Sequence, residues 1–115
     1  MTNFEIAKKQ VEFVKTKLNE LDDQTGGECK GLIIADYTKD EYKKFLPEEN
    51  WDEYVETQFL FIHFLKAENL NNKVVLQHID WEGFQKFAAE KGLKNDASAR
   101  SWYAVVKHGK ENSEK

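Results

Sequence analysis

Cysteine, proline and methionine each occur once among the 115 residues, and no apolar run approaches the roughly 20 residues of a membrane-spanning helix. The single Cys29 excludes an intramolecular disulfide, and the amino terminus lacks the apolar stretch of a secretory signal. We therefore expect a reducing, cytoplasmic setting and no membrane partner. The near absence of proline and the presence of fifteen aromatic residues argue against disorder, although 33% of the residues are charged.

Length and charge indicate one domain of ordinary size. With 115 residues and a formal net charge of −4, the chain is long enough to bury a core of its own. No internal repeat is present, and the only low-complexity stretch is a polar end. We predict a single compact domain over residues 1–109 and a polar tail over residues 110–115.

Helix starts are marked by residues that cap the first turn. Their side chains accept hydrogen bonds from the free backbone N–H groups there, and a Glu three residues later completes a capping box. These signals predict helices from residue 3 to about 21, from 39 to about 46, from 51 to about 69, and from 81. Apolar residues recur every three or four positions from Phe4 to Leu21, which indicates a buried stripe or, as the alternative, a coiled coil with a second copy. The caps are Thr2 with Glu5, Thr38 with Glu41, Asn50 with Glu53, and Asp80 alone.

Two short apolar segments are typical of buried strands. Leu32–Tyr37 and Val74–Ile79 are rich in apolar and β-branched residues, so we predict that they pair. The segment Phe59–Leu65 is apolar on every face, which favours a central helix covered on most sides, with a strand as the alternative. A loop is predicted for Asp22–Gly31. The predicted fold class is α+β, mainly α, with about five helices around that central helix.

The last third of the chain has the pattern of a helix-turn-helix. Residues 84–110 hold six basic and two acidic residues, whereas residues 1–83 hold ten basic and seventeen acidic ones. Gly92 favours a left-handed cap after the first helix, and Leu93 can fold back as its hydrophobic partner. The match weakens beyond the turn, because Ser98 and Ser101 stand where the DNA-binding motif has apolar residues.

This unit supports a DNA-binding hypothesis. The second helix, from a cap at Asn95 or Asp96 to about His108, would enter the major groove and Arg100 would contact bases. The alternative is that both helices only close the core, with Trp102 among the buried residues. The predicted nucleic-acid-binding residues are Lys91, Lys94, Ser98, Arg100, Ser101 and Lys107.

The acidic part of the chain supports a second hypothesis. The range 36–56 contains eight acidic residues and three lysines, interleaved with aromatic residues. Carboxylates along a helix can imitate a phosphate track and attract a basic protein, while Trp and Tyr supply anchoring energy. A small acidic inhibitor or adaptor, of the type that phages and mobile elements carry, would act in this way. Its predicted protein-binding residues are Asp52, Glu53, Glu56, Trp51 and Tyr54.

The sequence gives little support for an enzymatic function. His63, His78 and His108 lie far apart in the sequence without a metal-ligand spacing, and His63 is predicted to be a hydrogen-bonded core residue. Cys29 has no base placed beside it. We predict no catalytic set, no metal and no cofactor, and therefore a non-enzymatic binding or regulatory protein. The chain indicates neither its partner nor its oligomeric state.

Overall fold

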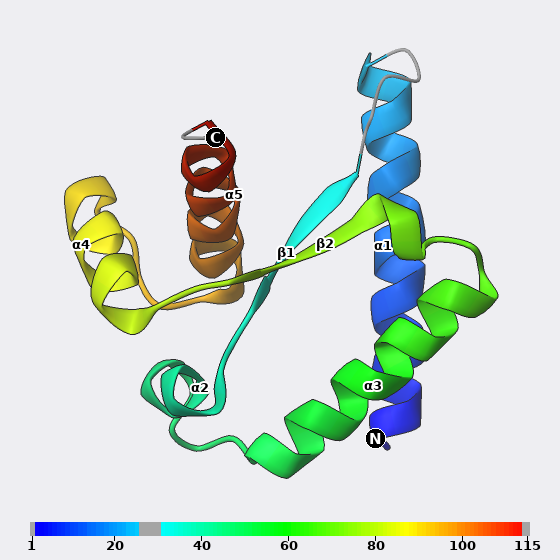
Figure 1. Cartoon of the computed structure of the whole chain (residues 1–115), viewed down its shortest axis with the longest axis horizontal. Coiled ribbons are helices and arrows are strands. Elements are labelled where there is room, and N and C mark those ends of the chain that lie inside the picture. The colour runs from blue at the N-terminus through cyan, green and yellow to red at the C-terminus, as the bar shows by residue number, and fades with distance from the viewer. Residues whose placement is uncertain (1, 26–30, 114–115) are drawn as a thin grey trace. The chain divides into compact units, whose positions relative to one another are not determined.

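The computed structural model describes residues 2–25 and 31–113, and these form five α-helices, one short 3₁₀ helix and two strands (Figure 1). The predicted α+β, mainly α class is confirmed. The segment 59–65 is helical, so the strand alternative is wrong. In chain order the elements are α1 (Asn3–Thr25), β1 (Leu32–Asp36), α2 (Lys39–Phe45), α3 (Trp51–Ala67), the 3₁₀ helix η1 (Asn71–Lys73), β2 (Val74–His78), α4 (Trp81–Lys91) and α5 (Ala97–Ser113).

All four predicted caps form. Backbone N–H groups donate to the side chains of Thr2, Thr38, Asn50 and Asp80 over 3.1, 3.4, 3.0 and 2.8 Å respectively. Each bond satisfies a donor that has no partner within its helix. The helix starts were therefore predictable from the local sequence.

Two helix ends were predicted too early. α1 continues to Thr25, four residues beyond Leu21, because no glycine or proline interrupts the chain before Gly26. α5 continues to Ser113, so the first part of the predicted polar tail is helical. Residues 26–30 of the loop predicted for residues 22–31, which include Cys29, lie outside the described residues.

The two strands pair, as predicted, and the sheet that they form is parallel. The Ile79 N–H donates to the Asp36 carbonyl over 3.0 Å just beyond the paired segments. Parallel strands need a long crossover connection, and here α2, α3 and η1 provide it.

The chain divides into two compact units, and each is described by itself. Unit 1 comprises Met1–Leu32 and Asn50–Val75, and unit 2 comprises Ile33–Glu49 and Leu76–Lys115. The single domain over residues 1–109 stays a prediction.

Unit 1 is built from α1 and α3. The apolar stripe of α1 packs against α3 within the chain, as expected, and Ala7, Val11, Val14 and Leu18 are buried. The opposing side of α3 buries Thr57, Phe61 and Leu65. At the end of the stripe, Phe4 meets Phe64 edge to face with ring centroids 5.1 Å apart.

Unit 2 has an aromatic core. Phe45 of α2 and Phe84 of α4 are each 2% exposed, and their ring centroids lie 5.2 Å apart. α3 belongs to unit 1 and the aromatic residues of α4 and α5 belong to unit 2, and a core shared between them stays a prediction. An all-apolar stretch indicates a helix that is buried on every side. Within unit 1, however, α3 is buried only on the side that faces α1. The other aromatic residues in ring contact here are Tyr37, Tyr42, Trp81, Phe87, Trp102 and Tyr103.

Candidate binding surfaces

The α4–α5 pair has the predicted turn. Gly92 adopts the left-handed conformation with φ 66°, and the Leu93 N–H donates to the Ala88 carbonyl over 2.9 Å. Asp96 is the cap of α5, because its carboxylate accepts the Ala99 N–H over 2.8 Å. The end of α4 at Gly92 is of the Schellman type, in which a positive φ is easiest for glycine.

Two of the six predicted nucleic-acid-binding residues are engaged inside unit 2. Arg100 Nη1 donates to Asn95 Oδ1 over 2.7 Å and also interacts with the Tyr37 hydroxyl. Burial raises the pKa of Tyr37, and the Arg100 charge works against that increase. Lys107 Nζ lies 2.9 Å from Asp80 Oδ1. These two cations stabilise unit 2, and presenting them to DNA would require breaking those contacts.

Asp80, the partner of Lys107, accepts several hydrogen bonds in unit 2. It caps α4 through the Gly83 N–H and also accepts from the Tyr103 hydroxyl over 2.7 Å. Burial alone would raise the pKa of Asp80, but the hydrogen bonds from Lys107, Tyr103 and the Gly83 backbone outweigh it and lower the pKa to about 2. Burial and the neighbouring Asp80 raise the pKa of Tyr103. A side chain at Gly83 would collide with the Tyr103 hydroxyl.

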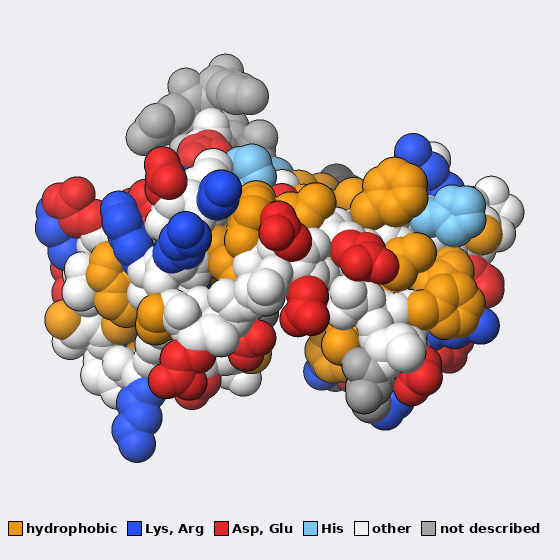
Figure 2. All heavy atoms as spheres, turned by 90° about the horizontal axis from the view of Figure 1, so that it is seen from below, with side chains coloured by type: hydrophobic (Ala, Val, Ile, Leu, Met, Phe, Trp, Pro, Cys, Tyr) orange, Lys and Arg blue, Asp and Glu red, His pale blue; other side chains and the backbone are white. Residues whose placement is uncertain are grey.

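The other four predicted residues, Lys91, Lys94, Ser98 and Ser101, are exposed. Unit 2 as a whole is not basic, because it holds ten basic and eleven acidic residues, although residues 84–110 within it have a basic excess. On the face seen in Figure 2, acidic and basic side chains are interspersed and neither sign forms a continuous field. This charge balance gives little support to phosphate binding, which depends on neutralising many phosphates.

Trp102 is 46% exposed, so the prediction that it is buried is wrong. The small Ala99 and Ala104 and the half-buried Tyr103 take the inward positions of α5, which turns Trp102 outward. Its ring meets Phe87 at 90° with centroids 5.4 Å apart. The outward face of α5 therefore carries no charged side chain, and it consists of Ser98, Ser101, Trp102, Val105 and Gly109.

The predicted acidic range 36–56 is divided between the two units. Asp52, Glu53 and Glu56 are all exposed on the first two turns of α3. Trp51 and Tyr54 are half-buried and stack on each other with centroids 5.4 Å apart. The remaining acidic residues of the range 36–49 belong to unit 2, where Glu41 accepts the Trp81 N–H over 2.7 Å and Asp36 lies 3.2 Å from His78.

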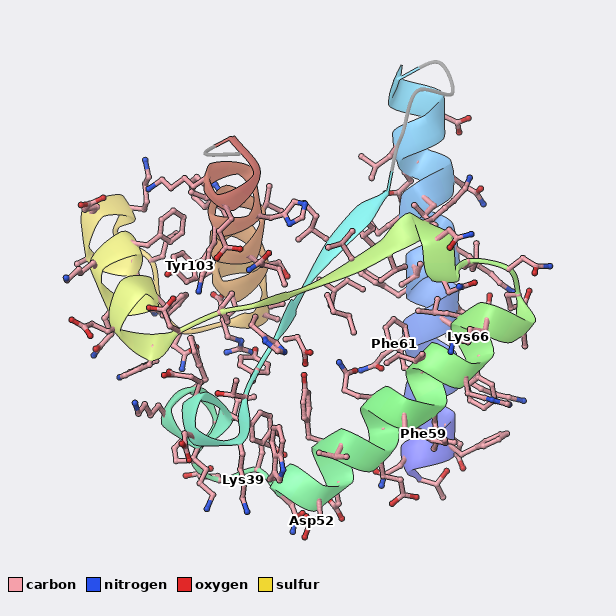
Figure 3. All side chains as sticks on the ribbon, in the orientation of Figure 1. Lys39, Asp52, Phe59, Phe61, Lys66 and Tyr103 are labelled. Carbon is pink, nitrogen blue, oxygen red and sulfur yellow. The ribbon has the colours of Figure 1, made fainter. Side chains whose placement is uncertain are left out.

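The acidic turns of α3 continue into an exposed apolar ridge that the sequence analysis missed. Phe59 is 71% exposed and lies on the side of the helix opposite the buried Phe61 (Figure 3). Val55, four residues before Phe59, is 45% exposed. His63, predicted to be a core residue, is exposed one turn beyond Phe59. A helical projection centred on Thr57, Phe61 and Leu65 would have identified this outward face. We name it the α3 ridge: Asp52, Val55, Glu56, Phe59, His63 and Lys66.

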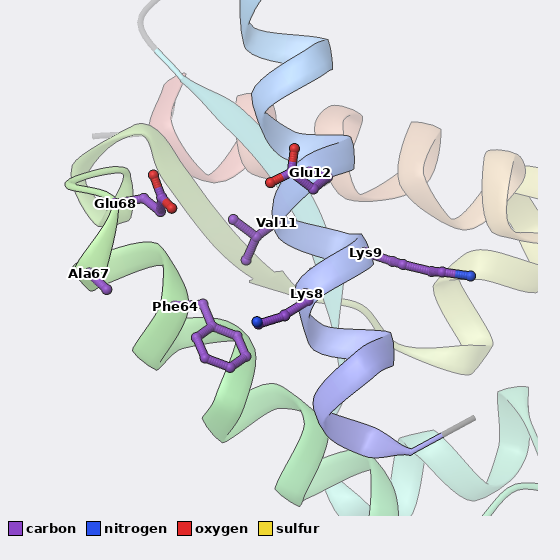
Figure 4. Close-up of a pocket in the computed structure, with 7 residues that line it drawn as sticks. All are labelled: Lys8, Lys9, Val11, Glu12, Phe64, Ala67 and Glu68. Carbon is purple, nitrogen blue, oxygen red and sulfur yellow. The ribbon is translucent and has the colours of Figure 1, made fainter.

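Unit 1 also has a groove of about 310 Å³ along the seam between α1 and α3 (Figure 4). Lys8 on its border lies 4.7 Å from the Phe4 ring centroid, and Glu12 and Glu68 add carboxylates. Among the residues that the structure describes, no three His, Cys, Asp or Glu side chains gather closely enough to hold a metal ion. The groove carries charges of both signs, and its polar side chains do not converge on one point. It therefore indicates no particular ligand.

No protein-family model matches the chain, and searches of curated proteins and of solved structures also found no match. None of the described helices is both long enough and apolar enough to cross a membrane.

Proposed function

We propose that this is a non-enzymatic regulatory protein that binds a basic protein partner through the α3 ridge. This corresponds to the acidic inhibitor or adaptor hypothesis. The observation that supports it most is the 71% exposure of Phe59 on the same helix face as Asp52 and Glu56.

The carboxylates alone would be weak support. Asp52 and Glu53 lie in the first turn of α3, where negative charge stabilises a helix against its own dipole. Phe59 has no such role in folding, because its side chain is largely exposed. Large apolar side chains exposed together, with charges around them, are typical of interaction sites.

The spacing on α3 suggests how the partner binds. Val55, Phe59 and the half-buried Ile62 follow one another at i, i+4 and i+7, which is the anchor pattern of a helix that lies in an apolar groove. The partner would offer such a groove with Lys or Arg at the end that receives Asp52 and Glu56. The apolar anchors would supply most of the affinity, and the charges would speed association and select the partner.

Capture of partners from a source-cell lysate with the full chain as bait tests this proposal. The decisive baits are Phe59→Ser and the triple variant Asp52→Asn, Glu53→Gln, Glu56→Gln. Phe13→Ser on α1 is the matched control, because Phe13 is 58% exposed in the same unit but outside the α3 ridge. We expect one nuclease-resistant, salt-sensitive partner that both decisive baits lose and the control retains. Equal capture by all four baits would refute the proposal.

DNA binding is the second candidate. It is favoured by the exposure of Lys91, Lys94, Ser98 and Ser101 on and beside the α4–α5 turn. If it is correct, the full chain should bind duplex DNA at low salt, and Lys94→Ala should lower the salt dependence by about one unit of slope. Absence of duplex binding by the intact protein at low salt would exclude this candidate.

A further inference from the structure

The α3 ridge carries opposite charges at its two ends. Asp52 lies seven residues before Phe59 and Lys66 lies seven residues after it, and all three are labelled on α3 in Figure 3. Seven residues make about two helical turns, so the three side chains share one face of the helix. Asp52 and Lys66 are both exposed, and neither has an ion-pair partner among the residues that the structure describes.

The helix dipole explains the sign of these two charges but not the face on which they lie. A carboxylate in the first turn and a lysine in the last turn stabilise any helix, wherever they lie around its axis. Glu53, for example, is in the first turn of α3 but on another side of the helix. The dipole therefore leaves unexplained why Asp52 and Lys66 share the face of Phe59.

Apolar side chains fill the positions between the two charges. Positions 52, 55, 59, 62 and 66 are separated by three and four residues in turn, which is the spacing of a coiled-coil seam. Val55 and Phe59 are exposed along it, and Ile62 is half-buried. The seam covers only about two heptads, fewer than the three or four of a sustained coiled coil, so a pair formed through it would be weak.

We propose that the α3 ridge binds the ridge of a second copy, as an antiparallel helix pair with its two-fold axis beside Phe59. Residues equally far before and after the axis lie opposite each other in such a pair. Asp52 of each copy therefore meets Lys66 of the other, and the two Phe59 rings pack at the centre. The ridge is its own complement in charge, as a two-fold interface must be.

A second exposed aromatic residue of unit 1 shows what this requirement excludes. Phe13 of α1 is 58% exposed, but Lys9 and Lys17 lie four residues before and after it. An antiparallel pair centred on Phe13 would place these lysines opposite each other, and like charges in such positions oppose pairing. Lys17 also lies over the Phe13 ring, 5.7 Å from its centroid. Charge complementarity thus selects α3 and not α1 for the second copy.

Self-association would regulate the surface that the proposed function uses. The second copy covers Phe59 and brings Lys66 to the place where a basic partner would bring its own cation to Asp52. The two occupants exclude each other, so the partner binds only after the weak dimer dissociates. This regulatory role rests on the proposed function, whereas the pairing itself does not.

Sedimentation equilibrium of the full chain over a concentration series measures the pairing. We expect a dimer that dissociates on dilution and weakens as salt is added. Phe59→Ser should weaken it about 30-fold or more, as the loss of a central aromatic anchor does. Phe13→Ser, which removes an exposed phenylalanine of the same unit, should leave the dimer unchanged. A wild-type chain that stays monomeric into the millimolar range overturns the proposal.

Exchange of the two charges tests the antiparallel register. Asp52→Lys and Lys66→Asp should each weaken the homodimer about tenfold or more, because both ion pairs of the dimer become repulsive contacts. A chain with both changes should pair again. An equimolar mixture of the two single variants should form a heterodimer that is tighter than either homodimer. Circular dichroism checks that each variant is folded. Recovery in neither the double variant nor the mixture would overturn the register.

Lys66→Asp also separates this proposal from the proposed function. It removes the cation that the second copy supplies and keeps Asp52, Glu56 and Phe59 for a basic partner. Lysate capture by this bait should therefore equal or exceed capture by wild type, and a loss of capture would overturn the regulatory role. A dimer with the expected charge dependence, together with capture that is equal for all baits, supports the pairing and refutes only the proposed function. A monomeric wild type whose capture depends on Phe59 overturns only the pairing.

Discussion

α3 and α5 are both 17 residues long, but they direct their charged side chains differently. α3 buries Thr57, Phe61 and Leu65 and exposes its carboxylates. Between Ala97 and Gly109 the charged residues of α5 are Arg100 and Lys107, and both are engaged within unit 2. A count of charges along a sequence therefore does not show which charges a partner meets.

The largest expected difference in stability is between alanine variants of two phenylalanines. Phe84→Ala should cost about 3 to 5 kcal/mol, because Phe84 is 2% exposed in the aromatic core of unit 2. Phe59→Ala should cost less than about 0.5 kcal/mol, since its ring is mainly exposed. Chemical denaturation of both variants measures the difference. A large loss for Phe59→Ala would mean that α3 is covered on its outward face, and the contrast between the helices would fail.

Asp80 should account for the next largest effect. Asp80→Asn should destabilise the protein by about 2 to 3 kcal/mol, because Lys107 and Tyr103 both lose the carboxylate they donate to. The folded-state pKa of about 2 lies below the ordinary value near 3.9, so the stabilisation is complete above about pH 5 and is lost as the pH falls toward 2.

Denaturation of wild type and Asp80→Asn between pH 2 and pH 7 would measure this dependence. The two stability curves should converge as the pH falls. A constant gap across that range would show that the Asp80 carboxylate does not take part in the acid sensitivity.

A smaller effect is expected for Trp102. Trp102→Ala should cost one isolated chain about 1 to 2 kcal/mol, because one side of the ring packs on Phe87 and the other is exposed. The measurement is thermal unfolding at low protein concentration. A loss as large as that for Phe84→Ala would place Trp102 in the core and remove the uncharged outward face of α5.

The smallest effect concerns the acidic end of α3. Replacing Asp52, Glu53 and Glu56 by Asn, Gln and Gln should change stability by less than about 0.5 to 1 kcal/mol, because all three are exposed. Part of any loss would come from the helix dipole and from the bond between Asn3 and Glu56. Calorimetry at low and high salt would separate these contributions. A larger loss would show that the carboxylates serve folding more than binding.

Local signals predicted the elements well, and long-range packing limited the prediction of the surfaces. Caps such as Asn50 and Asp80 act within three residues, so their helices were identified from the sequence alone. The exposure of Phe59 and Trp102 depends on which side of a helix finds a neighbour, and the neighbour of α3 is α1, more than 25 residues earlier in the chain. The engagement of Lys107 likewise depends on Asp80, 27 positions away. The amino-acid composition does not show which distant residues will come into contact.

The interleaving of the two units has a consequence for synthesis of the chain. Unit 1 ends at Val75, while unit 2 still lacks β2 beyond that residue, α4 and α5. Every residue of unit 1 therefore leaves the ribosome before the aromatic core of unit 2 can close around Phe45. For that interval Phe45 on α2 lacks the rings of Trp81 and Phe84 that pack against it, so the segment exposes apolar surface until α4 has been made.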